Sequence, residues 1–137
     1  MGEINNTASL RVLNPQYDPY SINLDKVISM ESSGNPQAFN VGSQAKGLGQ
    51  ITPIALRDWN QMNPQDQYSP NQLYDPQINQ KIAYWMLTER LPQQLRSKGV
   101  PVTLETVLQA YHDGAGNVAA GRIGPEGRGY IPKYKKG

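Results

Sequence analysis

The feature that most constrains the fold of this chain is a series of segments whose apolar residues recur at helical spacing between capping and helix-breaking residues. The first has Leu24, Val27 and Ile28 at positions i, i+3 and i+4. Ser21 precedes it as a predicted N-cap, and Gly34 follows it as a predicted stop. This pattern predicts a helix that buries one face.

Further segments carry start signals of the same kind. Thr52 begins a predicted short helix, Asp75 a longer one and Thr103 a fourth, and in the first two a proline occupies the first helical position. A fifth short helix is predicted over residues 117–122. No segment shows sustained strand alternation, and at most a small β element is expected within residues 38–50. The sequence therefore predicts a mainly α fold.

One acidic residue lies on the apolar stripe of the first predicted helix. Seven residues after Leu24, the same helical phase reaches Glu31, close to the predicted helix end. Burial disfavours a charged carboxylate, and the carbonyl dipoles at a helix C-terminus disfavour negative charge. Both effects raise a carboxyl pKa, so Glu31 is the candidate for a group that exchanges a proton near neutral pH.

Two polar clusters accompany this acid. Residues 43–52, SQAKGLGQIT, form a glycine-rich segment that suits either a substrate-groove wall or an ordinary turn-rich connection. Tyr111 lies on the apolar face of its predicted helix just before a glycine-rich break, which suits either a core tyrosine or a phenol in a cleft. His112 is the only histidine, and we expect it to be a partly exposed residue without a catalytic role.

Composition narrows the remaining possibilities. The 137 residues include no cysteine, which excludes disulfides and cysteine-ligated metal sites. The net charge of +2 is low for a protein that follows a phosphate backbone, so nucleic-acid binding is not expected, although basic residues concentrate near the C-terminus. No apolar stretch is long enough to span a membrane. The N-terminus lacks the layout of a secretory signal.

Several motifs occur together in a fixed order along the chain. They are ESSGNP from Glu31, a serine at position 43, GLGQI over residues 47–51, AY at residues 110–111 and YI at residues 130–131. This series resembles the catalytic domain of the soluble lytic transglycosylases, a branch of the lysozyme-like superfamily. The resemblance spans about residues 21–134. It implies a mainly α, lysozyme-like domain of the α+β class with a substrate groove and a small β element.

The same resemblance implies an organisation for the chain. Residues 1–20 are expected to form an irregular N-terminal arm, residues 21–134 the transglycosylase domain and residues 135–137 a tail. The domain is expected to be monomeric, without a metal ion or organic cofactor, and to bind peptidoglycan glycan strands. Its expected site of action is the peptidoglycan layer. The missing signal sequence favours a phage-encoded or virion-associated protein, or a fragment of a longer chain.

The family's reaction also comes from the resemblance. Its members cleave the β-1,4 bond between N-acetylmuramic acid and N-acetylglucosamine and form a 1,6-anhydro product with one glutamate, here Glu31. Ser43 and Gln50 would line the site and hydrogen-bond the substrate or the glutamate. Tyr111 would orient the reacting group, and Tyr130 would support the cleft from the C-terminal segment.

The sequence departs from the family pattern at two places. Gly49 stands where the family has methionine, so a groove-wall side chain is expected to be missing. His112 and Asp113 stand where the family has Asn-Ala. Asp113 leaves open a hydrolytic muramidase that uses Glu31 with this second carboxylate. A non-catalytic peptidoglycan-binding or virion structural module is the alternative from another class.

Overall fold

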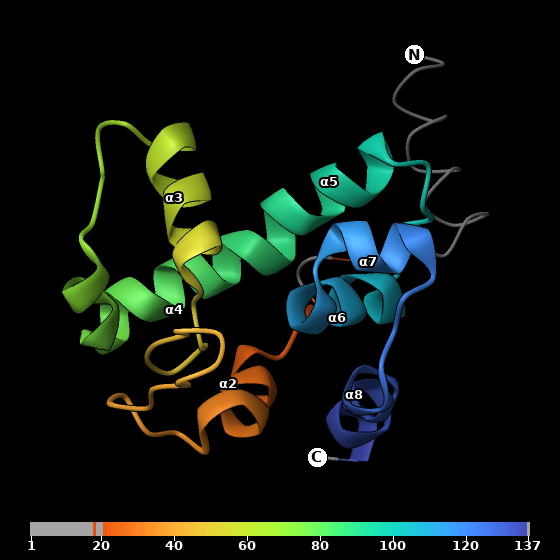
Figure 1. Ribbon diagram of the computed structural model, residues 1–137, viewed down its shortest axis with the longest axis horizontal. Coiled ribbons are helices and arrows are strands. Elements are labelled where there is room, and N and C mark those ends of the chain that lie inside the picture. The colour runs from red at the N-terminus through yellow and green to blue at the C-terminus, as the bar shows by residue number, and fades with distance from the viewer. Residues whose placement is uncertain (1–17, 19–20, 137) are drawn as a thin grey trace.

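The computed structural model describes Asp18 and residues 21–136, and helices account for most of them (Figure 1). Helices α4, η3 and α5 follow one another without a break and form a long rod; in Figure 1, α3 lies above this rod and α2 below it. The elements in chain order are α2 (Leu24–Ser32), α3 (Pro53–Met62), η2 (Pro70–Tyr74), α4 (Pro76–Trp85), η3 (Met86–Arg90), α5 (Leu91–Ser97), α6 (Leu104–Asp113), α7 (Ala115–Ala120) and α8 (Pro125–Lys136).

The mainly helical prediction is confirmed, and so is the small extent of β structure. Between α2 and α3, the only β pairing in the described residues is a pair of isolated antiparallel bridges, Phe39 with Lys46 and Lys46 with Ile51. These bridges fold the glycine-rich segment into a compact loop, which lies beside α2 in Figure 1.

Most of the predicted helix starts are observed. Thr52 accepts a hydrogen bond from the backbone N–H of Ala55, and Asp75 and Thr103 cap their helices in the same way. The prediction for Ser21 is wrong, because the first helix begins at Leu24 and Asn23 provides its cap. The Ser21 hydroxyl instead donates to the carbonyl of Asp18.

The C-terminal helix α8 was not predicted. Its two glycines and two prolines indicate a loop when the sequence is read alone. Tyr130 and Tyr134, one helical turn apart, are both buried and join the core formed by α2, α5 and α6. The energy of burying these rings outweighs the weak helix propensity of the segment. The helix continues through Lys136, and the predicted arm lies outside the described residues except for Asp18.

Two hydrophobic clusters meet at the centre of the molecule. One joins α2 with the helices from η3 to α8 and includes Val27, Leu87 and Leu108, whereas the other joins the loop before α3 with α3, η2 and α4. Met86 and Tyr111 pack against both clusters. The junction brings the end of α2, the glycine-rich loop and α6 close to one another, and Glu31 and Tyr111 lie there.

Candidate functional site

Glu31 lies in the last turn of α2, one residue before the helix ends at Ser32. The helix stops there because Ser33 adopts a left-handed conformation, with φ of 55°, and its backbone N–H bonds to the carbonyl of Ser29. Val27, one turn earlier on the same stripe, is fully buried. The helical phase therefore directs the Glu31 side chain toward the centre of the molecule, as the sequence predicts.

Tyr130 is the hydrogen-bond partner of Glu31. Its hydroxyl donates to Oε2 of the carboxylate over 2.6 Å, from a helix 99 residues further along the chain. Burial raises the pKa of Glu31, whereas the Tyr130 hydrogen bond and the charge of His112 act in the opposite direction and lower it. Burial is the largest of these effects, so the net pKa lies above the usual value of 4.5. The predicted direction and its main cause are confirmed.

The second oxygen of the Glu31 carboxyl group remains available. Oε1 has no hydrogen-bond partner among the described residues, yet it is not sealed from solvent. Among the described residues, Oδ2 of Asp113 is the only buried side-chain nitrogen or oxygen without a hydrogen-bond partner, so Oε1 of Glu31 is not such an atom. Because Tyr130 already occupies Oε2, Oε1 is the oxygen that can carry a proton to a bound molecule.

Tyr111 ties the glycine-rich loop to α6. Its hydroxyl donates to the carbonyl of Gly49 over 2.6 Å. Burial and the nearby charge of Glu31 both raise the pKa of this tyrosine, so it remains a neutral donor. The Tyr111 hydroxyl thus binds the glycine-rich loop beside Glu31.

A buried residue that the sequence analysis did not single out holds the same loop from the other side. Asn79 of α4 is fully buried, accepts from the N–H of Gly49 over 2.7 Å and donates to the carbonyls of Lys46 and Leu73, each over 2.8 Å. An asparagine on the inner face of an otherwise apolar helical stripe was the available sequence signal, because such a residue needs internal partners.

Gly49 faces the interior rather than the groove. A Cβ atom at this position would lie 2.8 Å from the Tyr111 hydroxyl and 2.9 Å from Cβ of Ala83, both closer than normal contact. The expectation that this glycine leaves a gap in the groove wall is therefore wrong. In this chain the absence of a side chain allows the loop to approach α4 and α6.

Gln50 and Ser43 occupy different positions in the loop. Gln50 is half-buried with φ of 53°, and its amide nitrogen donates to the carbonyls of Ala38 and Gly47. Ser43 is exposed, and its hydroxyl accepts from the backbone N–H of Ala45 over 3.3 Å. No contact between Ser43 and Glu31 is present in the described residues, so only Gln50 lies at the cavity described next.

A cavity of about 440 Å³ opens between α3, the α4–α5 rod and the junction of α6 with α7. Gln50, Tyr111 and His112 contribute to its wall, together with apolar groups such as Met86. His112 also packs against Tyr130, with ring centroids 5.0 Å apart, and Tyr130 in turn bonds to Glu31. Neither Glu31 nor Tyr130 lines the cavity itself, so the proposed acid lies behind the cavity wall at His112. Apolar walls with a few polar groups are typical of a small-molecule or sugar subsite.

Asp58 of α3 also lines this cavity. Its two carboxylate oxygens accept from Nε and a terminal nitrogen of Arg90, over 2.7 and 3.0 Å. This bidentate ion pair compensates the charge of Asp58, so Asp58 is a structural residue of the cavity wall.

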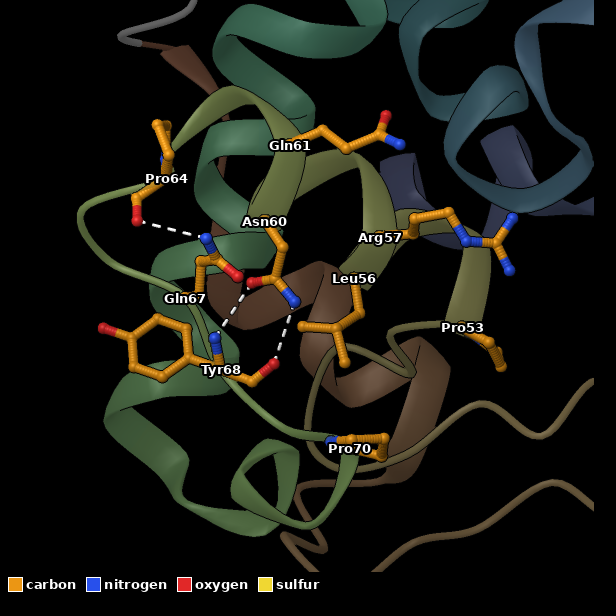
Figure 2. A pocket seen from close by; sticks show the side chains of 9 residues that line it. All are labelled: Pro53, Leu56, Arg57, Asn60, Gln61, Pro64, Gln67, Tyr68 and Pro70. Carbon is orange, nitrogen blue, oxygen red and sulfur yellow. Dashed lines mark hydrogen bonds between the residues drawn. The ribbon is translucent and has the colours of Figure 1, made fainter.

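A second hollow lies on the other flank of α3 (Figure 2). Asn60 exchanges hydrogen bonds with the backbone of Tyr68, and Gln67 donates to the carbonyl of Pro64, so these side chains hold the surrounding loop in place. The hollow contains none of the predicted site residues. The cavity beside His112 is therefore the better candidate for a functional site.

Neither a metal centre nor a membrane span is evident in the part of the chain that the structure describes. No group of three or more His, Cys, Asp or Glu side chains lies close enough there to hold a metal ion. No helix in residues 21–136 is long and apolar enough to cross a bilayer.

The comparison with known families agrees with this arrangement. Residues 16–123 match the Transglycosylase SLT domain, and the chain belongs to this family. A similar solved structure is the 70 kDa soluble lytic transglycosylase SLT70 from Escherichia coli, with 29% sequence identity and a TM-score of 0.62. The match covers 80% of this chain but only 19% of that protein. No curated protein matches the chain.

Proposed function

We propose that this chain is a peptidoglycan lytic transglycosylase that cleaves the β-1,4 bond between N-acetylmuramic acid and N-acetylglucosamine with Glu31 as its acid and base. The observation that carries this proposal is the setting of Glu31, a partly buried residue whose carboxyl pKa is raised, with one oxygen held by Tyr130 and the other free. Membership of the transglycosylase family supplies the substrate class.

The proposed reaction needs a single carboxyl group. Glu31 first gives the proton on Oε1 to the glycosidic oxygen, while the substrate's own acetamido oxygen stabilises the developing charge at C1. The resulting carboxylate then takes the proton of the muramyl C6 hydroxyl as that oxygen attacks C1 and closes the 1,6-anhydro ring. A group that serves as acid and then as base works best with a pKa near the working pH, and burial moves Glu31 in that direction.

The other predicted residues receive supporting roles. Tyr130 would stabilise the carboxylate form of Glu31, because its hydroxyl donates to that group. Tyr111 would orient the reacting region by fixing the loop at Gly49, and Gln50 would form part of the wall. Ser43, exposed at the tip of the loop, would reach only a longer bound strand.

The contacts of Asp113 favour the transglycosylase over the hydrolytic muramidase. Asp113 lines the cavity, but one of its carboxylate oxygens meets Nδ1 of His112 and the other is buried beside Gly127. A second carboxylate that positions water must present an oxygen to that water. Replacement of Asp113 with alanine, the residue usual in the family, is therefore expected to leave most of the activity intact at the optimum pH.

Clearing of a peptidoglycan suspension tests the proposed function. Glu31→Gln is expected to reduce the rate of clearing by about a hundred- to ten-thousand-fold, the usual contribution of general acid–base catalysis. Binding of the variant to the peptidoglycan should be retained. The amide has no charge to bury, so the variant should be at least as stable as the native chain at neutral pH. If the native chain and the Glu31→Gln variant both bind the peptidoglycan and neither clears the suspension, the chain is instead a non-catalytic module.

A further inference from the structure

His112 and Asp113 form a connected pair at the end of α6. Nδ1 of His112 lies 3.2 Å from Oδ1 of Asp113, and the ring is three-quarters buried, with 25% of the side chain exposed. A carboxylate at this position accepts the Nδ1 proton and so fixes the orientation of the imidazole. Nε2 has no partner among the described residues and is not sealed from solvent, because the only sealed unpartnered atom there is Oδ2 of Asp113. His112 is also one of the residues that line the cavity.

The backbone of α8 encloses the Asp113 carboxylate. A Cβ atom at Gly127, in the first turn of α8, would lie 2.0 Å from Oδ2 of Asp113, so only glycine fits beside it. Oδ2 is buried and has no hydrogen-bond partner in the described residues. The carboxylate is thus fixed in place with His112 as its one observed polar side-chain contact, which leaves it little freedom to serve any other group.

The same imidazole is in contact with the proposed acid through Tyr130. The His112 ring packs on the Tyr130 ring with centroids 5.0 Å apart, and the Tyr130 hydroxyl donates to Glu31 over 2.6 Å. When His112 carries a proton, its positive charge favours the carboxylate form of Glu31. Three helices, α2, α6 and α8, therefore meet at one set of proton-binding side chains.

Other charged groups around the cavity do not duplicate this effect. Tyr111 is the second titratable group of α6 beside Glu31, and it remains neutral. Asp58 of α3 is paired with Arg90 of η3, and α7 contributes no titratable side chain. Lys98, just after α5, lines the cavity, but the pKa of Glu31 is shifted by burial, Tyr130 and His112 and not by Lys98.

We propose that His112, oriented by Asp113 and packed on Tyr130, is a positioning residue whose charge lowers the upper pH limit of cleavage. Its protonated form favours the carboxylate of Glu31, so Glu31 loses the proton that the first step needs at a lower pH than it would beside a neutral ring. This inference rests on the proposed function for its effect on cleavage, but the electrostatic link between the two side chains is independent of any activity.

The test compares the pH dependence of kcat/KM for the native chain, His112→Asn and His112→Gln. Both replacements are neutral; asparagine places a polar atom near the Nδ1 position, and glutamine places one near Nε2. The alkaline limb of the profile is expected to move to higher pH in both variants, because loss of the imidazolium lets Glu31 keep its proton longer. Lys135→Gln removes one positive charge from the surface, where Lys135 pairs with Glu105, and should leave the limb in place.

A side-chain NMR titration of the Glu31 carboxyl in the same proteins separates the two proposals. A higher Glu31 pKa in both histidine variants supports the link even if no protein cleaves peptidoglycan, in which case the proposed function fails and the link stands. An unchanged Glu31 pKa in the histidine variants overturns the inference. A uniform loss of rate with an unmoved limb also overturns it, since a purely structural role for His112 would have that effect.

Discussion

At the level of single residues, Glu31 has a carboxyl group whose two oxygens lie in different environments. Oε2 of Glu31 accepts the Tyr130 hydrogen bond, while Oε1 is free to exchange a proton with a bound molecule. Burial makes Glu31 a weaker acid, and Tyr130 limits that effect by stabilising the carboxylate. The balance between the two contributions decides the pH range in which one group can both give and take a proton.

Tyr130→Phe tests this balance. The variant loses a hydrogen bond to a charged group, worth about 1.5–3 kcal/mol, so we expect kcat to fall by about tenfold to a hundredfold. Because the hydrogen bond lowers the pKa of Glu31, its loss should raise that pKa and move the alkaline limb of the rate profile to higher pH.

The matched control for this variant is Tyr134→Phe, one turn further along α8. The Tyr134 hydroxyl accepts from the backbone N–H of Asn23 and has no contact with Glu31 among the described residues. Its loss should affect stability without moving the limb. If the profiles of the two phenylalanine variants shifted equally, the specific role of Tyr130 would be wrong.

At the scale of the elements, the loop between α2 and α3 is held from two sides. Tyr111 of α6 binds the carbonyl of Gly49, and Asn79 of α4 binds its N–H as well as two neighbouring carbonyls. Gly47, with φ of 78°, makes the close approach to Asn79 possible, because a Cβ there would lie 2.2 Å from the Asn79 amide nitrogen. The wall of the candidate site is therefore fixed by buried polar contacts.

Asn79→Ala should weaken this arrangement. The replacement leaves the N–H of Gly49 and the carbonyl of Leu73 without the Asn79 partner, whereas the carbonyl of Lys46 still accepts from the N–H of Ile51. Each buried group left unpaired costs about 1–3 kcal/mol. We expect the free energy of unfolding, measured with urea, to fall by about 3 kcal/mol. Gln77→Ala on the exposed face of the same helix is the control, and equal losses in the two variants would contradict the role assigned to Asn79.

The sequence predicted the elements whose signals are local. Thr52, Asp75 and Thr103 were identified as caps because a cap depends on neighbouring residues only. Helix α8 was missed because the burial of Tyr130 and Tyr134 against distant helices outweighs its glycines and prolines. The position of Glu31 on a buried stripe followed from periodicity, whereas its contact with Tyr130, 99 residues away, required the tertiary structure.

At the scale of the whole molecule, two hydrophobic clusters meet where the candidate site lies. Tyr111 packs against both, so the site is built at the junction of two cores. The family match ends at residue 123, yet α8 beyond it contributes Tyr130 to the site and encloses Asp113. The predicted monomeric state and division into arm, domain and tail remain predictions.

The mass of the muropeptides released from purified peptidoglycan distinguishes a single-glutamate transglycosylase from a hydrolase. With Glu31 acting alone, the muramyl end should be a non-reducing 1,6-anhydro sugar, one water lighter than the hydrolysis product. The same digest with Asp113→Ala should give the same anhydro products, since Asp113 has no direct part in the proposed reaction. Reducing muramyl ends as the main product of the native chain would contradict the single-glutamate transglycosylase and support a muramidase that delivers water.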